Sequence, residues 1–411
     1  MAGTGRTRAI PGSPGSSLLP PLGLTLGLLA ARIAGAPALS DPTGLPVPQG
    51  LQLRAPPSYV VLAPVYTLWD GAAMLSMSRL QGFVLGLALL FLAWRIVRAL
   101  RRRRAVLRDE LRALTVGCVL LALFIGGGLL SHRPMIRLDG QGPNLVAVDF
   151  HSHTTASHDV RRWYDTRANL EWHQRAGFDA VFVTDHNTTA GLVPEDVPVA
   201  LCRGREVSAW RAHIVLLGGE LDSLSGPYRR DWAGLLQLLR DADTLYHSLT
   251  VASLPEYERH HWSRLDALAA AGLDGFEIVN ASPKANELTR ARQDSVIDLA
   301  RRRGKFVVGV SDQHGLGATS MVWSLMSLPG WQVEPDRLCW AIVDKLHAGF
   351  PAVQVVERHR LRADDWWPMW LTPLGLLWET WRGMGWAMTM AWLGWIWSLW
   401  VVARTRYLPS P

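Results

Sequence analysis

Two long apolar runs that flank a cluster of arginines restrict this 411-residue chain more than any other feature. The first run, 82–94, leads into Arg95, Arg98 and the arginine run 101–104, and the second run covers 114–130. Each approaches the roughly 20 residues that a helix needs to cross a bilayer, the first only if the Arg95 side chain reaches the membrane surface. Buried core helices fit poorly with two such runs around a basic loop, so we expect a membrane protein.

The arginine cluster also predicts the topology. The net charge of +7 and the pI of 9.7 would ordinarily suggest a nucleic-acid partner, but the charge is concentrated in one short loop between apolar runs. By the positive-inside rule this loop is cytoplasmic. Further spans at about 17–35 and 385–402 then place the middle of the chain outside the cell membrane. Arg133 and Arg137 weaken the charge asymmetry, so an inside-facing domain stays an alternative.

Composition divides the chain into four segments. They are a disordered tail at 1–16, an N-terminal membrane region at 17–143 with spans near 17–35, 82–99 and 114–130, a soluble domain at 144–356, and a Trp-rich membrane region at 357–411 with a span near 385–402. Two more apolar stretches carry charge. The stretch 59–77 contains Asp70 and is a span, an interfacial helix or a packed loop, and 366–381 contains Glu379 and is expected to lie at headgroup level.

Three cysteines are too few for a disulfide framework or a cysteine-based zinc site. We expect Cys118 in the membrane region, and Cys202 and Cys339 as core residues.

From residue 144 the pattern alternates between strands and helices. We expect strands at 145–148, 180–184, 214–217, 249–253, 276–279, 306–310 and 352–356, and helices at 166–176, 232–241, 263–271, 284–303 and 340–348. This alternation predicts a mostly parallel α/β fold, either a barrel or an open sheet. In both architectures functional groups collect at the carboxyl ends of the strands.

A His-Ser-His motif follows the first of these strands. Alternate residues of a strand point to one face, so His151 and His153 can converge on one centre if the strand persists, with Asp149 or a backbone carbonyl fixing a tautomer. A single histidine is more often a satisfied core residue than a ligand. Here, however, nine residues are metal-competent and most of them stand at a strand end, too many for one core to hide. They are His151, His153, His158, Asp185, His186, Glu206, His213, Asp312 and His314.

These ligands are all nitrogen or oxygen, a set that suits zinc, manganese or iron. A carboxylate such as Glu206 can bridge two ions, so a cluster of two or three divalent metals is expected. Such clusters lower the pKa of a bound water and hold both oxygens of a displacement. Hydrolysis is the chemistry that this set favours.

Five segments, in their order and spacing, resemble the PHP (polymerase and histidinol phosphatase) superfamily, in particular its branch with an "ITDHN" motif. They read DFHSHTTASHD, VFVTDHNT, GREVSAWRAHIVLLGG, DGFEIVN and VGVSDQHG, and they lie within about 144–356. The resemblance implies a distorted (β/α)7 barrel, here flanked by transmembrane helices. It also implies up to three metals at the carboxyl face of the barrel.

The resemblance also assigns ligands. One metal would take His151, His153, Glu206 and Asp312, a second would take His158, His186 and His314, and a third would share Glu206 with His213. The family's third site also uses the histidine of an "AHP" motif, where this chain has Ser253. His247, His260 or His261 could replace that histidine, so two or three metals can bind. His158 stands where many members have aspartate.

We therefore expect a membrane-anchored phosphoesterase in which a metal-bridging hydroxide attacks phosphorus. Asp185, His186 and Asp312 are the expected catalytic residues, although Asp185 could equally orient His186, and Glu277 is expected to be structural. Arginines near the motif loops are solvated or clamp a phosphate: Arg161, Arg162, Arg203, Arg205 and Arg211. The expected partners are the membrane and a small-molecule, lipid or envelope-derived ester, with no nucleic acid and the oligomeric state left open.

Two alternatives to the phosphoesterase remain. One is a carboxyl-ester or amide hydrolase that uses the same metals. The other is a metal-dependent ligand sensor without turnover.

Overall fold

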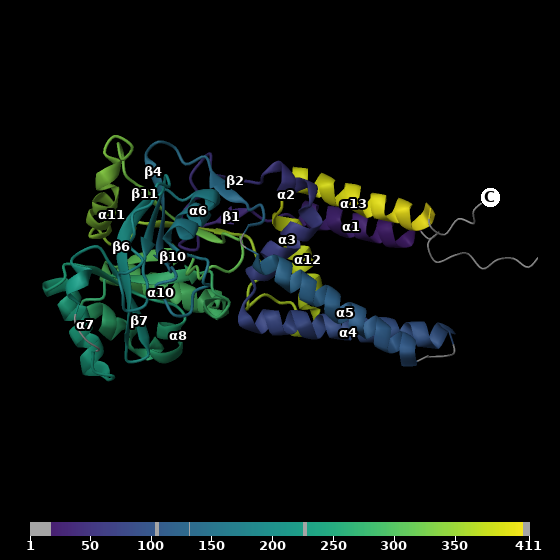
Figure 1. The fold of residues 1–411 in the computed structure, drawn as a ribbon, viewed down its shortest axis with the longest axis horizontal. Coiled ribbons are helices and arrows are strands. Elements are labelled where there is room, and N and C mark those ends of the chain that lie inside the picture. Colours follow the sequence, from purple (N-terminus) through teal and green to yellow (C-terminus); the bar gives the residue numbers. More distant parts are fainter. Residues whose placement is uncertain (1–17, 103–106, 131, 225–227, 406–411) are drawn as a thin grey trace, which may run out of the picture.

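The middle of the chain forms one curled sheet of ten strands, in the order β1-β12-β11-β4-β5-β6-β7-β8-β9-β10 (Figure 1). The computed structural model describes residues 18–102, 107–130, 132–224 and 228–405; the expected tail at 1–16 and part of the arginine run lie outside them. The strands are β1 Leu39–Ser40, β4 Leu145–Ser152, β5 Ala180–Val183, β6 Ala200–Ala209, β7 Ala212–Leu217, β8 Leu249–Ala252, β9 Gly275–Asn280, β10 Phe306–Val310, β11 Val322–Ser327 and β12 Gln354–Arg358. A separate pair consists of β2 Gln52–Arg54 and β3 Arg137–Asp139.

The sheet curls until β10 meets the end of β4. Asp312 N donates to His151 O at 2.9 Å, and His153 N donates to Gln313 O at 3.0 Å. Strands β4 to β10 therefore surround one apolar core, and β11, β12 and β1 continue the sheet beyond β4. This mixed α/β half-barrel agrees with the barrel expectation in its general form.

The strand directions are mixed, so the expectation of a mostly parallel sheet is only partly met. The pairs β4-β5, β5-β6, β8-β9 and β9-β10 are parallel, whereas β7 is antiparallel to both neighbours and β11 is antiparallel to β4 and β12. β6 and β7 are joined through Trp210 and Arg211 alone, both with positive φ. A two-residue loop closes a hairpin and is too short for a parallel crossover. β11 was not predicted at all.

Helices cover the outside of the barrel (Figure 1). They are α6 Thr166–Ala176, α7 Trp232–Thr244, α8 Glu256–His260, α9 Leu265–Ala270, α10 Arg290–Arg303 and α11 Leu338–Leu346. α6 has the predicted bounds because Asp165 caps its first turn and Gly177, at φ 90°, ends it. The predicted helix 284–303 begins only at Arg290, because Thr289 is the N-cap and a separate 3₁₀ turn precedes it.

A helical bundle extends from one side of the barrel (Figure 1). It consists of α1 Leu19–Ala34, α2 Pro57–Val61, α3 Ala63–Ala73, α4 Met77–Arg102, α5 Leu107–Leu129, α12 Thr372–Gly383 and α13 Trp386–Thr405. Within the described part of the chain, three of these are long and apolar enough to cross a bilayer, at Met77–Leu100, Arg108–Leu129 and Trp386–Thr405. α1 is apolar but shorter, and the two charged stretches form the short helices α2, α3 and α12.

A buried carboxylate joins this bundle to the barrel. Asp70 of α3 accepts hydrogen bonds from Tyr59 Oη at 2.9 Å, Arg133 Nη2 at 2.7 Å, Thr319 Oγ1 at 2.9 Å and Arg358 Nη1 at 3.0 Å. We call these five residues the Asp70 junction. Thr319 follows β10 and Arg358 ends β12, so the junction lies at the carboxyl ends of barrel strands.

Two further contacts link helix ends to the same edge. Met77 N, at the start of α4, donates to Pro283 O at 2.8 Å in the loop after β9. Gly317 N, in the loop after β10, donates to Leu129 O at 3.2 Å, where α5 ends. The bundle therefore packs on the edge of the barrel where the polar motifs lie.

Cys202 of β6 and Cys339 of α11 form a disulfide. Both residues belong to the barrel core, as expected, but the bond between them was not predicted, since the spacing of 137 residues gave no sign of their contact. Cys118 is a free, exposed cysteine on α5.

Candidate metal centre

Four buried or nearly buried side chains form the first group of candidate ligands. His151 Nε2 lies 3.0 Å from His153 Nε2, 3.5 Å from Glu206 Oε1 and 3.6 Å from Asp312 Oδ1. His153 Nε2 lies 3.6 Å from Glu206 Oε2 and 3.4 Å from Asp312 Oδ1. Four ligands that surround a tetrahedral zinc ion at about 2.1 Å are about 3.4 Å apart. These side chains therefore have the spacing of one coordination shell.

The hydrogen bonds of this group are those of a cation site. His151 Nδ1 lies 2.6 Å from Glu277 Oε1, which leaves Nε2 to face His153 Nε2 across 3.0 Å. Glu206 Oε2 is buried and lies 2.7 Å from His186 Nδ1, but it has no hydrogen bond of acceptable geometry. Buried polar atoms without partners are rare. A divalent cation would satisfy the facing nitrogens and this oxygen together, so the residues fit the metal that the motifs predict.

Positions on the strands aim these side chains. His151 lies in β4, and His153 follows its last residue. Asp312 follows β10 and has φ of 48°, a conformation that is uncommon outside glycine, asparagine and aspartate. The second residue after β10 thus turns its carboxylate towards the histidines, while Asn280 Nδ2 donates to Asp312 Oδ2 at 3.3 Å.

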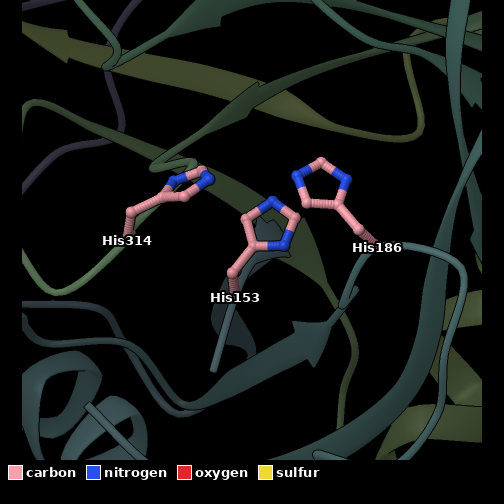
Figure 2. A group of neighbouring side chains, drawn as sticks. All are labelled: His153, His186 and His314. Atoms are coloured by element: carbon pink, nitrogen blue, oxygen red, sulfur yellow. The ribbon is translucent and has the colours of Figure 1, made fainter. Parts of the chain in front are cut away.

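A second group consists of His153, His186 and His314, whose ring nitrogens lie within 4.8 Å of one another. Figure 2 shows the three imidazoles side by side around one space. Asp159 Oδ2 lies 3.3 Å from Nε2 of both His186 and His314. His158 is exposed, with its ring centre 5.4 Å from that of His186. The structure therefore brings Asp159, which was not among the predicted ligands, to the position expected for His158.

A third group contains His186, Glu206 and His213. His213 Nδ1 lies 3.0 Å from Glu206 Oε1, and His186 Nδ1 lies 2.7 Å from Glu206 Oε2. Glu206 thus contacts histidines of all three groups. Ser253 contributes nothing here, since its hydroxyl contacts Leu254 O at 3.2 Å and Glu277 Oε2 at 3.4 Å.

None of the three histidines considered as substitutes at Ser253 belongs to a metal-competent group among the described residues. His247 precedes β8, at the opposite edge of the barrel. His260 is exposed on α8, and His261 Nε2 contacts Trp210 O at 3.0 Å.

Asp185 supports the loop that carries the ligands. Its carboxylate accepts hydrogen bonds from Thr154 N at 2.7 Å, Thr154 Oγ1 at 2.7 Å and Ser157 Oγ at 2.8 Å. Ser157 Oγ in turn accepts from His186 N at 2.9 Å. These hydrogen bonds engage the carboxylate of Asp185, which belongs to none of the three groups of candidate ligands. Its position therefore agrees with a role in orienting His186 rather than in contacting metal.

Asp149 and Glu277 are the other buried carboxylates of this region. Asp149 Oδ2 lies 2.8 Å from His173 Nε2, and its Oδ1 accepts from Ser311 N at 3.0 Å, so it ties β4 to the end of β10 instead of fixing a ligand tautomer. Glu277 has that second role, through His151 Nδ1. The sequence gave no indication of this contact, because Glu277 is 126 residues away from His151.

The charged forms of the histidines and carboxylates in the cluster stabilise one another. Burial lowers the pKa of His151, but Glu206 and Asp312 outweigh it and raise this pKa well above its usual value. In the same way burial is outweighed at His213 and His314, where neighbouring carboxylates raise the pKa to about 9. Burial raises the pKa of Glu206, yet contacts with histidines lower it well below its usual value. The metal-free cluster therefore retains protons that a bound metal must displace.

The arginines near the motif loops fall into two sets. Arg203 donates to Asp222 Oδ2 at 2.6 Å, and Arg205 donates to Asn187 O at 2.7 Å. Arg161 and Arg162 are exposed beside the cluster, and Arg161 N donates to His314 O at 3.2 Å. The guanidinium groups of Arg203 and Arg205 are thus engaged with the protein itself, whereas Arg161 and Arg162 are exposed.

No family model matches the sequence, and no curated protein matches it. Among solved structures, PsfC from Pseudomonas syringae PB-5123 is 19% identical, with 46% of this chain and 84% of that chain covered at a TM-score of 0.35. A two-domain protein containing a predicted PHP-like metal-dependent phosphoesterase, from Bacteroides vulgatus ATCC 8482, is 19% identical, with 48% and 64% covered at 0.34. An amidohydrolase from Chromobacterium violaceum is 16% identical, with 46% and 96% covered at 0.28.

All three TM-scores lie below 0.5, so the functional argument rests on the side chains of this chain.

Proposed function

We propose that the protein is a membrane-anchored, metal-dependent phosphoesterase of the PHP type, with β4 to β10 as its seven-stranded barrel. The observation that carries the proposal is the set of ligand-to-ligand distances, 3.0 to 3.6 Å, among His151, His153, Glu206 and Asp312. Asp159, His186, His213 and His314 would hold the second and third ions. Bound divalent ions, zinc, manganese or iron, would supply a water of lowered pKa and positive charge for the phosphoryl oxygens.

Hydrolysis of a phosphoester joins a water oxygen to phosphorus, breaks the ester P–O bond and leaves a proton on the departing alcohol. Asp312 Oδ2, whose one contact here is Asn280 Nδ2 at 3.3 Å, is the oxygen that would accept the proton of the water. His158, exposed beside His186, would return a proton to the alcohol. Arg161 and Arg162 would hold the phosphoryl oxygens that do not react.

The arrangement of the helices supports an extracytoplasmic barrel. Figure 1 shows that the C-terminal end of α4, the N-terminal end of α5 and the C-terminal end of α13 lie far from the barrel. Arginines occur at these remote ends, Arg102 in α4, Arg108 in α5 and Arg404 in α13, and the positive-inside rule places such ends in the cytoplasm. The Cys202–Cys339 disulfide supports the same orientation, since disulfides persist in oxidising compartments.

The membrane regions of this proposal are 17–143 and 357–411, with 144–356 as the catalytic domain. β1, at Leu39–Ser40, is an exception, because it pairs with β12 and extends the barrel sheet. α1 is proposed as a fourth span. It packs along α13 in one apolar cluster, and its 16 residues are about 24 Å long, so this span requires a locally thin bilayer.

The test uses the full chain in lipid nanodiscs. Metal content is measured by elemental analysis, and turnover is measured on p-nitrophenyl phosphate, bis(p-nitrophenyl) phosphate and p-nitrophenyl acetate. We expect two or three transition metals per chain and turnover of at least one phosphoester. Asp312→Asn keeps a residue that tolerates φ of 48° and should abolish turnover, whereas Asp274→Asn, at the opposite edge of the barrel, should retain it. Turnover of the acetate alone would refute the phosphoesterase.

A further inference from the structure

The candidate ligands lie within a few residues of the end of α5. His314 is three residues before Gly317, whose N–H donates to Leu129 O at 3.2 Å. Three residues span at most about 11 Å when extended. The Cα of His314 therefore lies no farther than this from a residue in hydrogen-bond contact with the last residue of an apolar helix.

A second connection reaches the start of α4. Asn280, which donates to Asp312 Oδ2 at 3.3 Å, is three residues before Pro283, and Pro283 O accepts from Met77 N at 2.8 Å. Met77 begins the other long apolar helix. Two independent loops thus place the cluster near the first residue of α4 and the last residue of α5.

The depth of a leaflet sets the scale for these lengths. A bilayer has a hydrocarbon core of about 30 Å and a total thickness of about 40–45 Å, so each headgroup layer is about 5–8 Å deep. The reach from the helix ends to the ligands is comparable with this depth. A headgroup phosphate at the surface of the bilayer therefore lies within reach of the cluster.

The edge of the cluster on this side is basic and aromatic. Residues 158–163, which we call the rim loop, present Arg161, Arg162 and Trp163 as exposed side chains. The ring of Trp163 lies 5.8 Å from that of His132, three residues after Leu129, and both line a cavity of about 370 Å³. Arginine binds phosphate, and tryptophan favours the headgroup layer. The rim loop thus joins the cluster to the membrane surface.

From this geometry we propose that the substrate is an amphiphile of the outer leaflet, whose phosphoester headgroup enters over the rim loop while its acyl chains stay in the bilayer. The proposal rests on the phosphoesterase function and specifies its substrate class. The water oxygen replaces the alcohol oxygen at phosphorus as in the general reaction, and only one of the two products stays in the membrane.

Surface dilution tests this route. The full chain is reconstituted in phosphatidylcholine vesicles that contain phosphatidic acid, a monoester, or phosphatidylglycerol, a diester. Glycerol 3-phosphate and glycerophosphoglycerol serve as the matched water-soluble esters. At constant bulk concentration of a subsaturating lipid substrate, tenfold more phosphatidylcholine should lower the rate about tenfold, because the enzyme meets substrate by its mole fraction in the surface. At least one acylated ester should also react at least tenfold faster than its soluble counterpart.

The inference would be overturned if p-nitrophenyl phosphate is hydrolysed but neither acylated ester reacts faster than its soluble counterpart. Absence of turnover with every phosphoester would refute the proposed function itself. Trp163→Ala should raise the surface KM several-fold with kcat retained. An unchanged surface KM would remove the rim loop from the entry route, and it would overturn the proposal in this form.

Discussion

Replacing Glu277 by glutamine should weaken metal binding about 10- to 100-fold, the usual cost of losing a hydrogen-bond partner of a metal ligand. Glu277 is fully buried and accepts from His151 Nδ1 at 2.6 Å, Leu254 N at 2.8 Å and Asn280 Nδ2 at 2.9 Å. Glutamine supplies one acceptor oxygen, and its amide group would face one of these donors. If it faces His151, the ring proton moves to Nε2, the nitrogen needed for the metal. The expected loss corresponds to about 1.4–2.7 kcal/mol.

The affinity is measured on the full chain in nanodiscs, by competition with a fluorescent zinc chelator. Asp274→Asn is the matched control. Asp274 also accepts a hydrogen bond from a neighbouring strand, from Thr250 N at 2.9 Å, but it lies at the opposite end of β9 from the metal-competent groups. This control should lower stability and leave the zinc affinity within about twofold. The reasoning is refuted if Glu277→Gln binds zinc as tightly as the wild type, or if the control loses affinity to the same degree.

Three further predictions concern protons, thiols and the junction. At His213 and His314 burial is outweighed by neighbouring carboxylates, which raise the pKa from 6.5 to about 9. As the pH rises from 6.5 to 9, the metal-free protein should therefore lose stability, whereas its affinity for zinc should increase. Tm scans and zinc titrations across this range measure the two trends, and a Tm that rises with pH in the absence of metal contradicts the prediction. Unfolded but unreduced protein should react with maleimide only at Cys118, and labelling at three cysteines before reduction would exclude the disulfide. Asp70→Asn should lower the free energy of unfolding by about 3–5 kcal/mol, because it breaks a buried ion pair. The control Asp139→Asn, which breaks the exposed pair with Arg54, should lower it by at most about 1 kcal/mol. Denaturant unfolding in nanodiscs measures both losses, and equal losses would show that the junction is not a buried ion pair.

Local patterns predicted much of the barrel. α6 and β10 have the expected bounds because a cap, a glycine and an apolar run each act within a few residues. The rule that alternate strand residues share a face placed His151 beside His153, and their ring nitrogens are 3.0 Å apart. Strand ends also indicated where the other metal-competent side chains would gather.

Features that depend on distant contacts were missed. Whether residue 158 or residue 159 turns towards His186 depends on the loop after β4, where no period applies. The contact of Glu277 with His151 and the disulfide between β6 and α11 join residues more than 100 positions apart. The antiparallel β7 follows from two residues with positive φ, Trp210 and Arg211, which carry no glycine or asparagine signal for such a turn.

The packing of the bundle on the loops after β9 and β10 has a consequence for where the proposed enzyme would act. The loop that carries Asp312 and His314 is held from behind by Leu129 and by the Asp70 junction, so a barrel released by proteolysis would lose a wall of its own catalytic mouth. With the proposed function and orientation, shedding from the cell would therefore inactivate the protein. Its products would then be delivered at the surface of the cell that made it.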